Sequence, residues 1–278
     1  DFNNPFSVGF ETEFGKIGIF NSGGNRKFQL EGEGIKSKNL SDKIKVVCAM
    51  PEDEFVFKSS PSEKRKFLDK ALSIINKSHA EALKSYKNLT LQRIKILENN
   101  EDANWLSVIE KQIAELAVLI AINRVLLVEE INHEMGKIPL EIQGKVVLKG
   151  ELESKIIGQN FISSIEEQVF AHKLLSTRAL DRITKRTLTG YEKVNFDIWF
   201  MQKNLSAFHA SSGEQKKLLF LFFISIIKVL INKDFKVIFL IDEVIAKLDL
   251  EGKNEIIKIL QSLSVQTFLT GTETEDIN

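Results

Sequence analysis

The chain is poor in the residues that build disulfide or zinc scaffolds, and it has no excess of charge of either sign. Its 278 residues include one cysteine, four histidines, 38 lysines and arginines, and 38 acidic residues. The single thiol, Cys48, excludes an intramolecular disulfide, and its apolar neighbours predict that it is buried. The histidines lack the spacing of zinc ligands. A net charge of zero gives no global field toward nucleic acid, so any DNA binding would depend on local basic patches.

Long hydrophobic runs are also missing. The longest apolar stretch, residues 218–231, is too short to span a bilayer and is interrupted by Ser225 and Lys228. Neither a signal peptide nor a transmembrane segment is evident. Together with the near absence of cysteine, this predicts a cytoplasmic protein that has no membrane partner.

The most informative feature that is present is residues 237–243, Val-Ile-Phe-Leu-Ile-Asp-Glu, an apolar run that ends in two carboxylates. Such a run predicts a strand buried on both faces of a parallel sheet, and ligands of these sheets gather at the carboxyl ends of the strands. There Asp242 suits Mg²⁺, which takes one or two carboxylates and keeps several waters. Glu243 suits the activation of a water that attacks a phosphoryl group. The competing interpretation is that an apolar strand ends in Asp by chance.

A second motif lies upstream, where residues 210–217, Ala-Ser-Ser-Gly-Glu-Gln-Lys-Lys, open the apolar stretch. Ser211 and Gly213 at a helix start leave backbone N–H groups and a hydroxyl free for a phosphate, although Ser-Ser-Gly is also an ordinary N-cap. The order of the segments is more specific. The Ser-x-Gly-x-Gln turn, the apolar helix, the carboxylate-ended strand and residues 246–249, Ala-Lys-Leu-Asp, resemble the signature motif, Walker B strand and D-loop of an ABC ATPase. A helix over 252–262 and a strand over 265–270 follow, where such ATPases carry their switch loop.

Residues 51–69 narrow the resemblance to one family. They read Pro-Glu-Asp-Glu-Phe-Val-Phe-Lys-Ser-Ser-Pro-Ser-Glu-Lys-Arg-Lys-Phe-Leu-Asp and resemble a signature of the bacterial RecF recombination mediators. Ser59 stands where that family usually has Gly, and Lys64 stands where it usually has Arg. The resemblance extends from about Lys45 to the C-terminus.

The resemblance implies a function. Such a protein binds ATP and Mg²⁺, forms an ATP-dependent homodimer, binds single-stranded or gapped DNA, and works with RecO and RecR in loading RecA at gaps and in SOS induction. Glu243 is then the catalytic residue, and Asp242 binds Mg²⁺ through water. The implied nucleotide contacts are Ser211, Gly213, Gln215, Asp242 and Asp249, of which the signature residues complete the partner's site.

Two features depart from the family. Near Gly190 the family has Gly-Pro-His-Arg-Asp-Asp, whereas this chain reads Gly-Tyr-Glu-Lys-Val-Asn. No Gly-x-x-x-x-Gly-Lys-Ser/Thr motif occurs, so the loop that cradles the β- and γ-phosphates is missing. We therefore expect a RecF-like chain without the N-terminal segment that carries the P-loop, and a weak ATPase only if the full-length protein has that segment. The alternatives are a degenerate head that binds DNA or a partner without catalysis, and an ABC transporter ATPase.

The pattern predicts an α/β fold, an ABC-type ATPase head with a mixed sheet and an inserted helical lobe. Two helices with one apolar stripe each, joined by the polar turn at 99–102, predict an antiparallel pair. The first stripe is Leu83, Tyr86, Thr90, Ile94 and Leu97. Further predictions are strand-like residues at 138–148, a helix over 159–175 and a strand over 195–200.

The expected domains are a β-rich remainder of the N-terminal lobe at 1–60, a helical lobe at 61–136 and a C-terminal ATPase lobe at 137–278. Two basic segments, 58–70 and 173–193, could contact DNA, with Lys64, Arg65 and Lys66 as the first candidates. A solvated helix face is the alternative for each segment.

Overall fold

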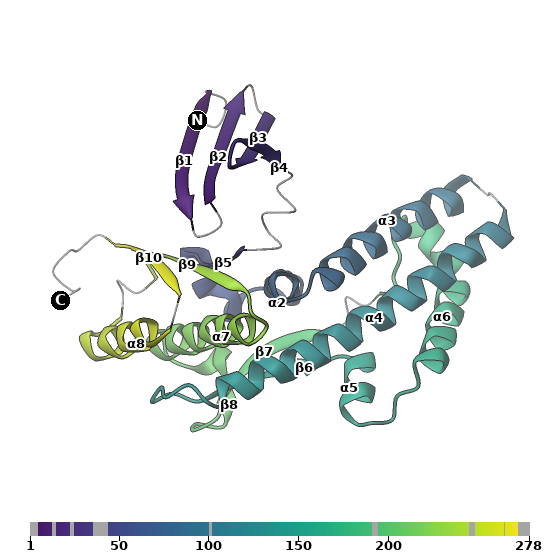
Figure 1. Ribbon diagram of the computed structural model, residues 1–278. Helices are drawn as coiled ribbons and strands as arrows, with labels where there is room; N and C mark the ends of the chain where they lie inside the picture. The colour runs from purple at the N-terminus through teal and green to yellow at the C-terminus, as the bar shows by residue number, and fades with distance from the viewer. Residues whose placement is uncertain are drawn as a thin grey trace.

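The computed structural model describes residues 5–12, 15–22, 25–35, 44–99, 102–190, 194–244, 248–263 and 265–271. Three small sheets are combined with a long helical lobe (Figure 1). The α/β class predicted from the sequence is confirmed. No helix in these ranges is long and apolar enough to cross a membrane.

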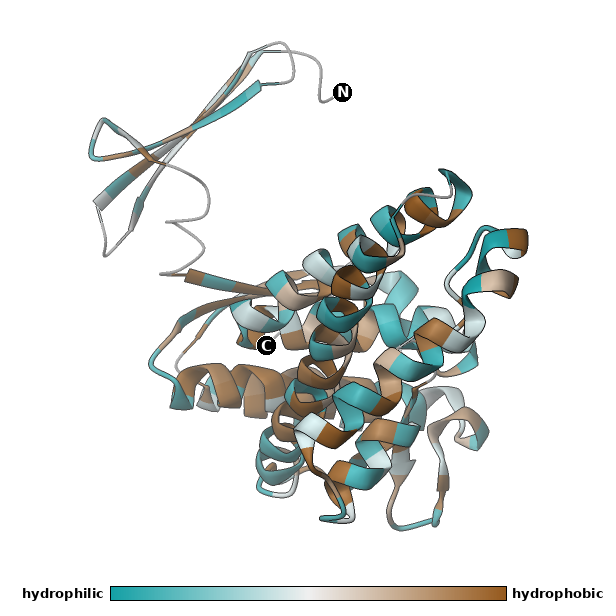
Figure 2. Cartoon of the chain, turned by 90° about the vertical axis from the view of Figure 1, so that its right-hand side faces the viewer, coloured by the Kyte–Doolittle hydropathy of each residue, from teal (hydrophilic) through white to brown (hydrophobic). Residues whose placement is uncertain are grey.

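The first sheet has four antiparallel strands in the order β1-β2-β3-β4 and stands apart from the helices in both views (Figures 1 and 2). Gly15 and Gly32 adopt positive φ at the turns that join these strands, a conformation that glycine reaches without steric cost. The strands are β1 (Phe6–Thr12), β2 (Gly15–Ser22), β3 (Asn25–Leu30) and β4 (Glu33–Ile35).

The second sheet is parallel, with β9 (Lys236–Asp242) between β5 (Ile44–Ala49) and β10 (Gln266–Thr270). Helix α7 (Ser212–Asn232) packs on one face, where the ring of Phe223 meets that of Phe239 at 6.2 Å. The prediction that β9 is buried on both faces is wrong. Its residues alternate between buried and half-buried, because among the described residues α7 covers only one face of the sheet.

The third sheet is antiparallel and lies beside the long helix labelled α4 in Figure 1. It consists of β6 (Gly144–Lys149), β7 (Asn195–Phe200) and β8 (Leu205–Ser206). The strand expected at 195–200 is confirmed residue for residue. Of the strand-like residues expected at 138–148, only those from Gly144 onward belong to a strand, β6.

Helix α2 (Pro61–Ile75) begins at the first residue of the helical lobe expected from the sequence. Ser60 is its N-cap, the Ser60 hydroxyl accepts a hydrogen bond from the Glu63 N–H, and the Glu63 carboxylate accepts one from the Ser60 N–H. A short 3-10 helix, η1 (Pro51–Lys58), precedes it. On the inner side of α2, Phe67 lies among the rings of Phe196, Phe222 and Phe223, with centroids 5.5 to 6.1 Å away. Helix α2 therefore packs against β7 and α7.

The predicted antiparallel pair is α3 (Lys77–Asn99) and α4 (Ala103–Met135). The apolar stripe of α3 is shifted, because Leu83, Thr90 and Ile94 are only half-buried. The fully buried positions of α3 include Arg93, which a count of apolar residues assigns to the surface. Helix α5 (Glu151–Ile157) was not predicted, and the helix expected at 159–175 is α6 (Ser163–Thr184).

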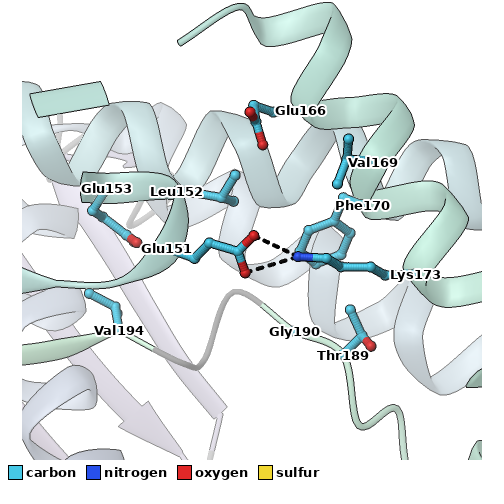
Figure 3. Close-up of a pocket in the computed structure, with 10 residues that line it drawn as sticks. All are labelled: Glu151, Leu152, Glu153, Glu166, Val169, Phe170, Lys173, Thr189, Gly190 and Val194. Carbon is cyan, nitrogen blue, oxygen red and sulfur yellow. Dashed lines mark hydrogen bonds and ion pairs between the residues drawn. The ribbon is translucent and has the colours of Figure 1, made fainter. Parts of the chain in front are cut away.

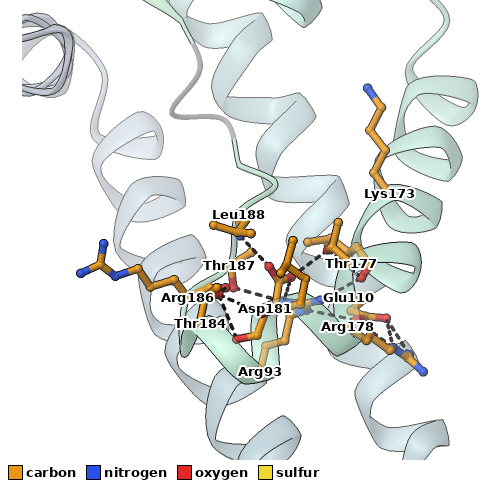
Figure 4. A network of polar contacts seen from close by, with 12 residues as sticks. Arg93, Glu110, Lys173, Thr177, Arg178, Asp181, Thr184, Arg186, Thr187 and Leu188 are labelled. Atoms are coloured by element: carbon orange, nitrogen blue, oxygen red, sulfur yellow. Dashed lines mark hydrogen bonds and ion pairs between the residues drawn. The ribbon is translucent and has the colours of Figure 1, made fainter.

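Arg93 of α3 is held by residues of α4 and α6 (Figure 4). Its guanidinium donates to Glu110 at 3.0 Å, to Asp181 at 2.8 Å and to the carbonyl oxygen of Leu174 at 2.8 Å. Arg178 donates to the same Glu110 carboxylate. A buried cation with this many acceptors fixes α3, α4 and α6 in one arrangement.

Two hydrophobic cores result. The larger surrounds α7 and includes Leu68, Leu72 and Ile75 of α2. The smaller lies within the helical lobe and takes Phe170 and Leu174 from α6. The lobe therefore draws on helices from two separate stretches of the chain.

Candidate functional site

The carboxyl edge of the parallel sheet brings together the end of β9 and the end of β10. Asp242, the last residue of β9, pairs in register with Thr270, whose hydroxyl donates a hydrogen bond to the Asp242 carboxylate. The N–H of Glu243 points to the carbonyl oxygen of Thr270 at 3.2 Å. The Asp242 side chain is half-buried and the Glu243 side chain is exposed. This edge can therefore present two adjacent carboxylates to a ligand in solvent.

Glu243 has a left-handed backbone, with a φ of +52°. This conformation is uncommon for a residue other than glycine, asparagine or aspartate, and such strain persists only where the surroundings impose it. Here the hydrogen bond to Thr270 turns the chain sharply away from the strand.

The Ser-x-Gly-x-Gln turn begins helix α7. Ser211 is the N-cap, and it forms a capping box with Glu214, whose carboxylate accepts the Ser211 N–H at 2.9 Å. Lys203 forms an ion pair with Glu214. The hydrogen bond from Lys203, followed by the one from the Ser211 N–H, holds the pKa of Glu214 below its usual value, so this carboxylate is charged at neutral pH.

Gly213 and Gln215 differ in what they can offer a ligand. A Cβ added to Gly213 would meet no atom within 4 Å, so the backbone there is open to approach. The side chain of Gln215 is buried, and its amide donates to the carbonyl oxygens of Ala207 at 2.7 Å and Phe208 at 3.2 Å. In this structure Gln215 fixes the turn that precedes the helix.

A cavity of about 550 Å³ joins the signature turn to the start of helix α8 (Leu250–Ser262). Asp249 caps α8 by accepting the N–H of Gly252 at 3.0 Å. Predicted residues Ser211, Gly213 and Asp249 all line the cavity, but Asp242 and Glu243 do not. The structure therefore divides the predicted residues between two places. Ala246 and Lys247 of the D-loop motif lie outside the described residues.

Sequence reasoning missed a set of side chains that connect this cavity to the rest of the fold. Lys217 lies between Glu141 and Glu255, at 3.6 and 3.8 Å. Glu255 also accepts the Glu141 N–H at 2.6 Å, and the Gln202 amide donates to the Glu141 carbonyl oxygen at 2.7 Å. No spacing in the sequence indicates these contacts, because their partners are 38 to 114 positions apart.

The departure at Gly190 falls beside a smaller cavity of about 170 Å³ between α5 and α6 (Figure 3). Lys173 reaches across it and forms two hydrogen bonds with Glu151, of 2.6 and 2.9 Å. Thr189 and Gly190 form part of the wall. Because its charges are already paired, the cavity offers little to an ionic ligand.

The three candidate DNA contacts on α2 differ in their surroundings. The Arg65 guanidinium donates to the carbonyl oxygen of Val194 at 3.4 Å, which turns it toward the start of β7. Lys66 is exposed and Lys64 is half-buried.

The fold and these motifs have known counterparts. The DNA replication and repair protein RecF of Rickettsia felis is 32% identical over 272 residues, which cover 93% of this chain and 71% of the relative. RecF of Rickettsia typhi is 31% identical over 259 residues, 87% of this chain and 68% of the relative. No protein-family model matches the chain.

Solved structures agree on the fold. The recombination mediator protein RecF in its complex named RecF-ATPrS has a TM-score of 0.75 at 21% identity, over 95% of this chain and 72% of that one. The structure named RecF-ATP has a TM-score of 0.73 at 20% identity, over 94% and 72%. Because the sequence identity to the Rickettsia proteins extends across most of both chains, the chain belongs to the RecF family of DNA replication and repair proteins.

Proposed function

We propose that this chain is the nucleotide-dependent head of a RecF-type protein, which binds DNA and dimerises around ATP. Family membership supports a role in DNA replication and repair. It argues against the alternative that the chain is an ABC transporter ATPase. The two solved RecF structures are named as complexes with ATP or an ATP analogue, which supports ATP as the nucleotide.

The observation that carries the proposal is the division of the predicted residues. The carboxylates of Asp242 and Glu243 lie at the edge of the parallel sheet, whereas Ser211, Gly213 and Asp249 line a separate cavity. Within one chain the two sets do not line a common cavity, so we infer that one chain does not use both sets on the same nucleotide. Two copies that face each other would place the cavity of one chain over the sheet edge of the other, so that each nucleotide is enclosed by both.

Each residue has a role in this arrangement. Bound Mg²⁺ would supply charge neutralisation for the phosphates, and Asp242 suits it because one carboxylate and several waters satisfy that ion. Glu243 would accept a proton from the attacking water. The start of α7, with Ser211 and the open backbone of Gly213, would donate hydrogen bonds to phosphate oxygens of the partner's nucleotide. Gln215 would hold that turn in place, and Asp249 would contact the nucleotide across the interface.

The finer functional assignment follows the family. We propose that the dimer binds single-stranded or gapped DNA and works with RecO and RecR in loading RecA at gaps and in SOS induction. Lys64, Arg65 and Lys66 are the DNA contacts proposed from the sequence. A cytoplasmic location accords with these partners.

A non-catalytic head is the second candidate. It is favoured by one observation, the absence of a Gly-x-x-x-x-Gly-Lys-Ser/Thr motif from these 278 residues. On this alternative Asp242 and Glu243 are relics, and the chain binds DNA or a protein partner without turnover.

The test uses a chimera in which the P-loop segment of a RecF relative precedes this chain. Glu243→Gln preserves shape but removes the base, so hydrolysis should fall roughly 100-fold or more while ATP-dependent dimers persist. Ser211→Arg places a bulky charge at the start of α7, so ATP binding should persist and the dimer should be lost. Glu251→Gln, at an exposed position of α8, is the matched charge control and should change neither property.

Sedimentation with ATP and a hydrolysis assay separate the outcomes. If both variants dimerise and hydrolyse like the unmodified chimera, the site assignment is wrong. A chimera that binds DNA but shows neither hydrolysis nor ATP-dependent dimers would establish the non-catalytic alternative.

A further inference from the structure

The outward face of helix α3 carries lysines that have no acidic partner. Lys84, Lys87 and Lys95 are exposed, and in the part of the chain that the structure describes none of them forms an ion pair. Both acidic residues of α3 have partners of their own, although Glu98 lies on the same face one turn after Lys95. Glu98 pairs with Lys185 at 3.2 Å, and Glu81 has an interaction of its own. The face is therefore positively charged in a protein whose net charge is zero.

Helical geometry places these lysines in one row. At about 3.6 residues per turn, positions 84, 87 and 95 fall within roughly a quarter of the circumference of the helix. The row spans about 16 Å along the axis, at about 1.5 Å per residue. Asn88 and Gln92 lie beside it and are exposed neutral hydrogen-bonding groups.

The row stands on a rigid support. The opposite side of α3 is buried against α4 and α6 through Ala82, Tyr86 and Ile96. Arg93 binds Glu110 and Asp181 in the same interface (Figure 4). Figure 1 shows α3 at the upper edge of the lobe, with α4 on its other side. The backbone positions of the three lysines are therefore fixed by the packing of the helix, while their flexible side chains can adjust to a ligand.

We propose that Lys84, Lys87 and Lys95 contact the phosphate backbone of duplex DNA. This rests on the DNA-binding function proposed above and names the surface and the form of the DNA. Lysines with neutral polar neighbours position a backbone without reading sequence. Proteins that hold single strands combine a basic groove with aromatic side chains on which bases stack. The only aromatic residue of α3, Tyr86, is buried, so the row offers charge and no stacking platform.

The choice of duplex DNA over an acidic protein also follows from the composition of this face. The only large apolar side chain in the row is Leu91, which is 56% exposed. Protein interfaces concentrate apolar and aromatic side chains at their centre and are depleted in lysine. A duplex presents about one negative charge per 1.7 Å, so the row would face several phosphates over its length.

The experiment compares binding of the unmodified chain and of Lys84→Gln/Lys87→Gln/Lys95→Gln to a short duplex and to a single strand of the same length. The slope of log affinity against log salt for the duplex should become shallower by roughly two to three units, because about 0.9 is lost per phosphate contact. The change should be the same for unrelated sequences. The control variant, Lys145→Gln/Lys149→Gln/Lys258→Gln, removes equal charge from exposed positions elsewhere and should leave the slope nearly unchanged.

Each outcome decides the proposal. An unchanged duplex slope in the α3 variant, at an unchanged melting temperature, overturns it and leaves the proposed DNA-binding function standing. If the slope of log affinity against log salt becomes shallower only for the single strand, the proposal is also overturned. If the unmodified chain binds neither DNA, this proposal fails, because the row lies on this chain and needs no ATP. The DNA-binding function proposed for the ATP-dependent dimer fails only if the chimera with a P-loop segment also binds neither DNA in the presence of ATP. An equal loss in the α3 variant and the control would show that only net charge matters, which likewise overturns the assignment to α3.

Discussion

Arg124 of α4 donates two parallel hydrogen bonds to Asp69 of α2, of 2.9 and 2.8 Å, and is itself fully buried. Glu153 of α5 and His79 of α3 complete the group, each with a contact of 3.2 Å. These four residues join α2, which packs against β7 and α7, to α3, α4 and α5. Asp69 is the last residue of the 51–69 motif that identifies the family, and here it contacts side chains of the chain itself. The motif therefore encodes a structural joint at this position.

Removing the charge of Asp69 should destabilise the protein strongly. Asp69→Asn leaves the buried guanidinium of Arg124 without its main counter-charge, and breaking such a pair costs about 3–5 kcal/mol. Urea denaturation should show a fall of this size in the free energy of unfolding. The exposed neighbour supplies the control, since Lys70→Gln should change it by less than about 0.5 kcal/mol. Equal values for the two variants would show that the pair is not formed.

The same group predicts a dependence of stability on pH. Burial acts to raise the pKa of Asp69, but hydrogen bonds from His79 and Arg124 and the positive charge of Arg124 outweigh it, so the pKa lies below the ordinary value of 3.8. A carboxyl group with a depressed pKa stabilises the fold above its unfolded pKa, and this contribution is lost as the pH falls through the folded pKa. The stability difference between the unmodified protein and Asp69→Asn should be constant near neutrality and shrink below about pH 4. A difference that grows on acidification would contradict the assignment.

The left-handed backbone of Glu243 predicts that glycine is tolerated better than alanine at this position. A residue with a Cβ costs about 1–2 kcal/mol in this region, and glycine avoids that cost but loses more entropy on folding. Glu243→Gly should therefore be about 0.5–1 kcal/mol more stable than Glu243→Ala, which keeps the Cβ. Thermal unfolding measures the difference. If Ala were the more stable of the two, the backbone at this position would not be strained.

Local pattern was sufficient for the elements that carry the motifs. The apolar run at 237–243 and the turn at Ser211 depend on neighbours in sequence, so β9 and the start of α7 were predicted almost to the residue. Arg93 was not predicted to be buried, since its acceptors Glu110 and Asp181 come from other helices. The contacts of Glu141 with Glu255 and Gln202 were missed for the same reason. A single sequence does not show which residues from distant parts of the chain contact a buried polar side chain.

The last prediction concerns ATP itself. These 278 residues contain no loop whose backbone N–H groups and lysine would cradle the β- and γ-phosphates. The cavity at the signature turn does not replace that loop, because its lysines, Lys203 and Lys217, already face Glu214, Glu141 and Glu255. Calorimetry on this chain alone should therefore show ATP binding no tighter than about 1 mM, a free energy of about −4 kcal/mol.

The chimera that carries a P-loop segment is the positive control and should bind at least about 100-fold more tightly, since it gains the phosphate cradle. Ser211→Arg should not weaken that binding, because the signature turn serves the nucleotide of the partner chain. Micromolar affinity for the chain alone would mean that its own cavity holds the phosphates. The proposed exchange of sites between two copies would then have to be abandoned in favour of a complete site within one chain.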